Sequence, residues 1–122
     1  MQWSDFFAII EEMQRAYLGE FELMVMLVLA RLGDDAYGVP ISRELEQQRG
    51  HSVSIGSVYA ALERLENKRL VASSLGDPTP ERGGRAKRYF RVTREGLEQI
   101  RATRQLLTRL WRGLPELKGE SA

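Results

Sequence analysis

Apolar residues recur at spacings of three and four along most of this chain, which is typical of amphipathic helices rather than strands. The first stripe is rich in aromatic residues and runs through Trp3, Phe6, Phe7 and Ile10. Ser4 is a candidate cap at its start. The pattern therefore predicts an N-terminal helix within residues 1–17.

Three more helices are predicted before residue 70. The segment 19–32 is apolar nearly all round, so it should be buried. A shorter helix covers about 39–48, because Pro40 is tolerated only in a first turn and Gly50 follows the end. Ser54 then resembles an N-cap for a helix over 54–67, whose inward face should hold Ile55, Val58, Leu62 and Leu65.

The period changes after Leu70, where residues 70–75 and 88–92 alternate as two strands do. Prolines and a glycine pair between them predict a loop over 76–85. Thr93 should cap a last helix. Its apolar stripe is close to a heptad pattern, interrupted at Arg104, and consists of Leu97, Ile100, Leu107, Trp111 and Leu114.

The order of three helices, a hairpin and a further helix predicts a mainly α fold with a small β-hairpin, a winged helix-turn-helix. We expect an N-terminal helix in 1–17 that supports a dimer and a winged helix-turn-helix domain in 18–93. A long C-terminal dimerisation helix should occupy 94–114, followed by a frayed tail in 115–122.

Composition excludes several functions. The 122 residues include no cysteine and one histidine, so thiolate or multi-histidine metal sites and most nucleophile–base pairs are ruled out. We therefore expect no enzyme, no metal and no cofactor. The longest apolar run, 23–30, is too short to cross a bilayer, and acidic residues near the N-terminus argue against a secretory signal. A cytoplasmic protein is the expectation.

Charge is distributed unevenly along the chain. Residues 1–50 hold four basic and nine acidic side chains, whereas residues 51–122 hold fourteen basic and eight acidic ones. Six of the basic residues lie in 82–94, around Gly83-Gly84, without an acidic one. A hairpin tip with this charge suits contact with the phosphates of a nucleic acid.

The face of the fourth helix opposite its apolar stripe carries small residues first and cations last. Ser57 and Ala60 would let the helix sit deep in a major groove, while Arg64 and Lys68 could contact bases or phosphates. We also expect the Ala60-Ala61 pair to be exposed. An ordinary solvated face is the alternative for this helix considered alone.

Five segments of the chain resemble the PadR family of transcriptional regulators: LGEFEL at 18–23, AYG at 36–38, VSIGSVYAALERL at 53–65, KRLV at 68–71 and ERGGRAKRYFRVT at 81–93. The resemblance implies a dimeric winged-helix DNA-binding protein, usually a repressor that releases DNA when an effector binds. It also implies that Tyr37, Ser54, Ser57, Tyr59 and the 82–87 wing touch DNA. The chain resembles the members with a short C-terminal region.

The candidate DNA-binding residues from both arguments are Tyr37, Ser54, Gly56, Ser57, Tyr59, Ala60, Arg64, Lys68, Arg82, Gly83, Gly84, Arg85 and Lys87. The candidate dimer interface consists of Trp3, Phe6, Phe7, Ile10, Leu97, Ile100, Leu107, Trp111 and Leu114. Both stripes could instead close the core of a monomer.

The expected partners are double-stranded DNA and a second copy of the chain, with no membrane. A small aromatic effector could bind among Trp3, Phe7 and Trp111. Two alternatives stay open: a winged-helix module for non-specific nucleic-acid or protein contact, and a MarR-like winged helix, which the wing and tyrosine motifs match less well.

Overall fold

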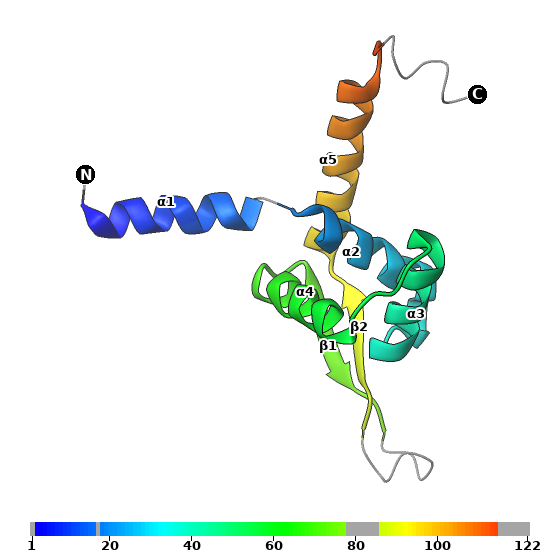
Figure 1. Cartoon of the computed structure of the whole chain (residues 1–122). Coiled ribbons are helices and arrows are strands. Elements are labelled where there is room, and N and C mark those ends of the chain that lie inside the picture. The colour runs from blue at the N-terminus through cyan, green and yellow to red at the C-terminus, as the bar shows by residue number, and fades with distance from the viewer. Residues whose placement is uncertain (1, 17, 78–85, 115–122) are drawn as a thin grey trace.

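The computed structural model describes residues 2–16, 18–77 and 86–114, and of residues 10–16 the backbone only. Five α-helices, one 3₁₀ turn and two strands follow one another in this part of the chain (Figure 1). They are α1 (Trp3–Ala16), α2 (Glu20–Leu32), η1 (Gly33–Asp35), α3 (Gly38–Arg49), α4 (Ile55–Asn67), β1 (Val71–Leu75), β2 (Arg88–Val92) and α5 (Arg94–Trp111).

The core forms where α2, α3 and α4 pack against one another and against the hairpin (Figure 1). Val25 and Met26 of α2 are fully buried, as predicted from the apolar segment 19–32. Ile41 and Leu45 of α3 meet them from one side, and α4 adds its own apolar stripe. Burying these side chains drives the three helices together and fixes the orientation of α4.

Side chains and glycine cap the helices as the sequence predicts. The Ser54 hydroxyl accepts a hydrogen bond from the Ser57 backbone N–H at 3.2 Å, and the Thr93 hydroxyl accepts one from Gly96 at 3.0 Å. Gly50 ends α3 with a φ of 80°, in the left-handed region that glycine adopts at low cost. These caps position the start of α4 and the start of α5.

The strands β1 and β2 form an antiparallel hairpin in which Val71 faces Val92 and Leu75 faces Arg88. The other edge of β2 is also used, because the Phe90 N–H donates to the Ala36 carbonyl at 2.8 Å and Tyr37 bridges to Tyr89. The segment before α3 thus holds the wing against the helical core. The fold is the predicted winged helix-turn-helix.

Several details differ from the sequence prediction. The helix α1 begins at Trp3, so Ser4 lies inside it and is not its cap. Ala61 is fully buried, so the expected exposed Ala60-Ala61 pair is reduced to Ala60. Ile55, expected in the core, is 44% exposed because it stands at the first turn of α4, beyond the cover of its neighbours.

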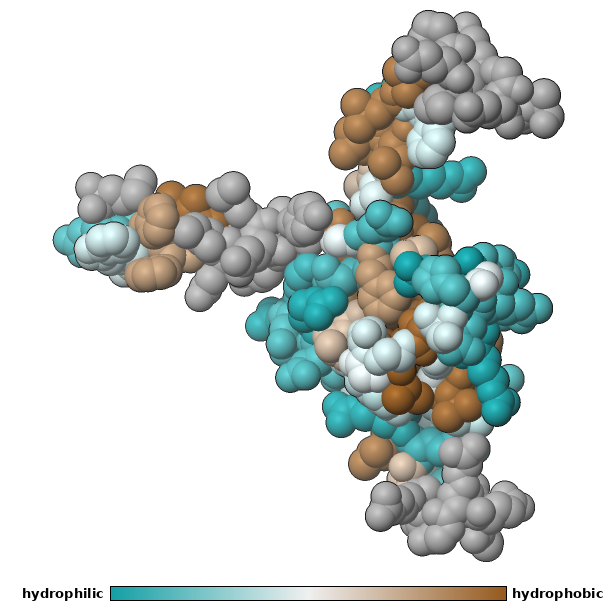
Figure 2. All heavy atoms as spheres, viewed as in Figure 1, coloured by the Kyte–Doolittle hydropathy of each residue, from teal (hydrophilic) through white to brown (hydrophobic). Residues whose placement is uncertain are grey.

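The helices α1 and α5 project from the core formed by α2, α3, α4 and the hairpin (Figure 1). Figure 1 shows α1 and α5 projecting away from it in different directions, so α1 does not pack beside α5 within one chain. Both expose apolar side chains, seen as brown patches on the two arms in Figure 2. Within residues 2–16, 18–77 and 86–114, no helix is long and apolar enough to cross a membrane.

Candidate nucleic-acid interface

The outer face of α4 is open to solvent. Ser54, Ser57, Ala60 and Arg64 are all exposed, as the sequence predicts. Gly56 is exposed too, and a Cβ added there would meet only the Ser54 hydroxyl, at 3.5 Å. Packing within the chain therefore does not require a glycine at this position. A surface of small side chains at the start of a helix leaves room for close approach of another molecule.

A hollow of about 410 Å³ lies beside this face. Residues of three elements and the turn before α4 line it, namely Phe21, Arg49, Ser52, Val53, Ser54, Ser57, Ala60 and Arg64. The hollow joins two guanidinium groups and three hydroxyl side chains, all of which can donate hydrogen bonds to an anion. Arg49 was missed by the sequence analysis, because it lies on α3 and only the fold brings it to α4.

Tyr59 lies on the other flank of α4, beside the hairpin. It is 46% exposed, and its ring centroid is 6.4 Å from that of Phe90. A Cβ at Gly38 would lie 2.7 Å from the Tyr59 Cζ atom, so only glycine lets the tyrosine pack there. Tyr59 therefore connects α4 to the hairpin and to the start of α3 while its remaining surface stays accessible.

The base of the wing carries an aromatic and cationic cluster. The Tyr37 and Tyr89 rings meet edge to face at 5.5 Å, and the Lys87 ammonium lies 4.5 Å from the Tyr37 ring centroid. The structure thus brings Lys87 and Tyr37 together, although they are fifty positions apart in the sequence. Arg82, Gly83, Gly84 and Arg85 lie outside the described residues.

Lys68 differs from its expected place on the open face. Its ammonium donates to both Glu22 carboxylate oxygens, at 2.7 and 3.0 Å, and its side chain is only 14% exposed. The Glu22 carboxylate also accepts from the Gly19 N–H, at the start of α2. Lys68 therefore connects the end of α4 to the start of α2.

A second ion pair fixes the hairpin to α4. The Arg88 guanidinium donates to the Ser73 hydroxyl at 3.0 Å, and this hydroxyl donates to the Glu66 carboxylate at 2.7 Å. Arg88 and Glu66 are themselves 3.6 Å apart. The network joins both strands of the hairpin to the C-terminal end of α4.

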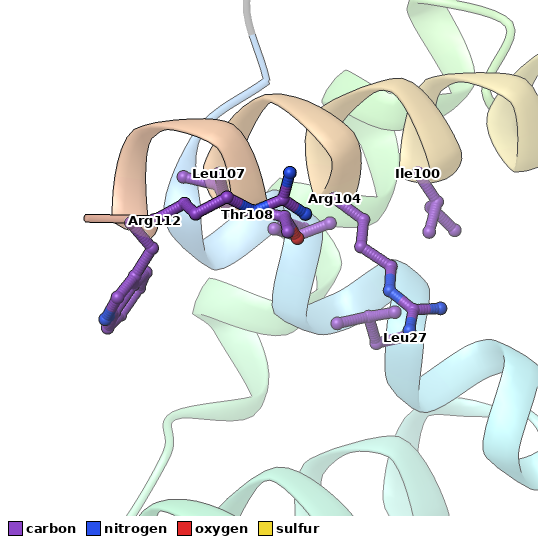
Figure 3. A pocket seen from close by; sticks show the side chains of 8 residues that line it. Leu27, Ile100, Arg104, Leu107, Thr108 and Arg112 are labelled. Carbon is purple, nitrogen blue, oxygen red and sulfur yellow. The ribbon is translucent and has the colours of Figure 1, made fainter. Parts of the chain in front are cut away.

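A groove of about 510 Å³ lies between α2 and α5, away from the face of α4 (Figure 3). Its walls are apolar, with guanidinium groups at the rim, and consist of Leu23, Leu27, Ile100, Arg104, Leu107, Thr108, Trp111 and Arg112. Trp111 lines this groove, but Trp3 and Phe7 lie on α1. One chain therefore does not bring together the three residues of the candidate effector pocket.

The aromatic residues of α1 form a cluster of their own. Trp3, Phe6 and Phe7 lie 5.8 to 6.1 Å apart between ring centroids and are between 42% and 75% exposed. The side chain of Ile10 is not among those described. Within the described part of the chain, no cluster of three or more acidic, histidine or cysteine side chains could hold a metal ion.

Comparison with known families gives a match over residues 25–102 to the model of the transcriptional regulator PadR-like family. The chain belongs to the PadR family. The match begins within α2 and covers α3, α4, the hairpin and the first half of α5. PadR members are transcriptional regulators, so this chain falls among regulators rather than enzymes.

Solved structures agree with the PadR assignment. A PadR family transcriptional regulator from Eggerthella lenta is 27% identical, with a TM-score of 0.62 over 93% of this chain and 92% of that one. A complex structure of hsRosR-S4 is 25% identical, with a TM-score of 0.65 over 88% of this chain and 86% of that one. Both matches cover most of this chain and most of the other.

Curated relatives are similar over part of their length. An uncharacterized 37.1 kDa protein in transposon TN4556 of Streptomyces fradiae is 38% identical over 86 residues, which are 70% of this chain and 23% of that protein. This PadR chain spans less than two thirds of the length of the curated relatives that it matches.

Proposed function

We propose that this PadR-family chain binds double-stranded DNA with sequence selectivity, and that α4 is its recognition helix in the major groove. The observation that carries the proposal is the exposed face of α4, where Ser57 and Ala60 come first and Arg64 last. The small side chains let the backbone approach base edges, and Arg64 is long enough to reach a guanine or a phosphate. The wing would follow the adjacent backbone.

Selection of duplexes from a random library tests this function. We expect an enriched sequence that the protein prefers over a scrambled duplex by 10³-fold or more, as is typical of specific regulators. Affinity for the scrambled duplex should fall steeply with salt, because it depends on phosphate contacts. Equal affinity for both duplexes would refute recognition by α4 and favour a non-specific nucleic-acid module.

We also propose that the functional unit is a homodimer built from α1 and α5. Each chain leaves two apolar surfaces uncovered: the aromatic cluster of α1 and the groove between α2 and α5. One copy's aromatic side chains suit the other's groove, since both surfaces are apolar and exposed. The operator would then be a pseudo-palindrome with half-sites about 10 base pairs apart.

Sedimentation equilibrium tests the dimer. A dimer at micromolar concentration is expected, and a monomer there would refute the interface.

Repression and relief by an effector are the remaining part of the proposal. They predict that transcription from a promoter carrying the selected operator falls when the protein is added, and that an aromatic ligand restores it. The same ligand should quench the fluorescence of Trp3 or Trp111.

A further inference from the structure

The hollow beside α4 contains an arginine that the proposed function has not used. Arg49 stands in the last turn of α3, and its guanidinium carbon is 5.8 Å from the centroid of the Phe21 ring. This cation–π contact orients the side chain while leaving it exposed. A guanidinium supported on an aromatic ring keeps its N–H donors available for a further partner.

The position of Arg49 relative to α4 is fixed by the turn between the two helices. The Ser42 hydroxyl donates to the Val53 carbonyl at 3.2 Å, and the Val53 N–H donates to the Glu46 carboxylate at 3.1 Å. Val53 is 7% exposed, so the turn is anchored in the core. Arg49 is therefore held beside Ser54 and Ser57 before any ligand arrives.

Neither arginine in the hollow forms an ion pair within the described part of the chain, although the Glu46 carboxylate lies at the turn, on the Val53 N–H. Arg31, Lys68 and Arg88 elsewhere on the body each pair with a glutamate. Within the described residues, neither Arg49 nor Arg64 lies within 4.0 Å of a carboxylate. Two such guanidinium groups beside three serines provide a site for an anionic oxygen such as a phosphate.

The two flanks of α4 face different elements. Ser57 and Tyr59 are two positions apart, which at about 100° per residue puts them on opposite flanks of the helix. Ser57 lines the hollow with Arg49, whereas Tyr59 contacts Phe90 of the hairpin. A helix in a major groove about 12 Å wide has a sugar–phosphate backbone on either side. On the Tyr59 side, the described part of the hairpin holds Lys87 against the Tyr37 ring, so Lys87 is the cation available to the backbone there.

We propose that Arg49 binds a phosphate of the DNA backbone on the Ser57 side of α4, so that Arg49 and the wing hold the two backbones that border one major groove. This inference rests on the proposed DNA-binding function and adds a contact that sets the depth and tilt of α4. Arg49 is a positioning residue and does not read a base.

The first experiment compares variants on a 30-base-pair duplex recovered by selection. Arg49→Ala should weaken binding about tenfold per subunit and lower the slope of log affinity against log salt by about 0.9 per subunit. Arg49→Lys, which keeps the charge, should recover much of the slope. Arg101→Ala removes the same charge from exposed α5 and should change neither quantity. Matching circular dichroism spectra show that all variants are folded.

The second experiment locates the contact. A set of duplexes carries one neutral methylphosphonate each, stepped along both strands of a half-site. For the wild-type protein, several positions should lose affinity. For Arg49→Ala, a methylphosphonate at one of these positions should no longer lower the affinity. The same should hold for Lys87→Ala at a different position, which lies across the major groove from the first.

Three results would overturn the inference. In the first, Arg49→Ala has the same DNA affinity and salt slope as Arg101→Ala. In the second, Arg49→Ala binds weakly but still loses affinity at every phosphate position that is sensitive in the wild type, which would mean that Arg49 only supports Phe21. The insensitive position could also lie on the same backbone as that of Lys87. If instead the wild-type protein itself shows no preference for the selected duplex, the proposed function fails and the Arg49 contact fails with it.

Discussion

Lys68→Met removes the cation from an ion pair that joins the end of α4 to the first turn of α2. The pair is largely shielded, with the two side chains 14% and 8% exposed. At 2.7 Å, two unit charges attract by about 6 kcal/mol at an effective dielectric constant of about 20. The cost of removing both charges from water is of similar size, so the intact pair contributes little net stability.

Removal of one partner is different, because the other charge stays buried without compensation. Breaking such a pair costs about 3–5 kcal/mol. The residual exposure of Lys68 puts the expected loss for Lys68→Met at the lower end, about 3 kcal/mol, or roughly 10–15 °C in melting temperature for a chain of this size. The double variant Glu22→Gln/Lys68→Met should recover to within about 1 kcal/mol of the wild type. Its glutamine can still accept the Gly19 hydrogen bond.

Urea unfolding followed by circular dichroism is the appropriate assay. Trp3 and Trp111 lie on the surfaces proposed to form the dimer, so their fluorescence would report dissociation as well as unfolding. Protein concentration must be held constant, since the stability of a dimer depends on it. Arg31→Met is the control, because the Arg31–Glu44 pair is exposed and should contribute at most about 1 kcal/mol. A loss in Lys68→Met no larger than that of Arg31→Met would refute this reasoning.

Three other substitutions test separate parts of the structure. Gly38→Ala should displace the Tyr59 ring and cost about 1–3 kcal/mol by overpacking, measured by the same unfolding assay, and a stable variant would mean that Tyr59 moves freely. Leu107→Asp places a charge in the α2–α5 groove and should convert the dimer to a monomer in sedimentation, while Arg101→Asp should not. Lys87→Ala should lower the salt slope of DNA binding by about 0.9 per subunit on every sequence; loss of sequence preference instead would assign Lys87 to base reading.

Local patterns predicted most of the fold. Caps at Ser54 and Thr93, the glycine after α3 and the change of period after Leu70 each depend on neighbours in sequence, and the structure confirms them. The two strands followed from the change to an alternating pattern, whereas their register is seen only in the structure. These features are set by local backbone and hydrogen-bonding preferences, which a short stretch of sequence contains in full.

Long-range contacts were the part that sequence could not supply. Lys68 has the exposed position on a helical wheel, but Glu22 is 46 residues away and draws it into an ion pair. Ala61 was expected to be exposed beside Ala60, but neighbouring elements bury it completely. Arg49 belongs to the hollow only because the turn at 50–54 folds α3 back beside α4. Each case depends on which element lies next to a face.

The charge distribution links the proposed dimer to the proposed DNA contact. The first seventeen residues carry three acidic side chains and one arginine, whereas Arg104 and Arg112 line the α2–α5 groove. Docking of one copy's α1 on the other's α5 would therefore be favoured by charge as well as by apolar contact, and it too would weaken with salt. A salt titration of DNA binding at low protein concentration would then mix two equilibria. The slope of log affinity against log salt reports phosphate contacts alone only when the protein concentration is well above the dimer dissociation constant. A slope that changes with protein concentration would identify salt-dependent dimerisation.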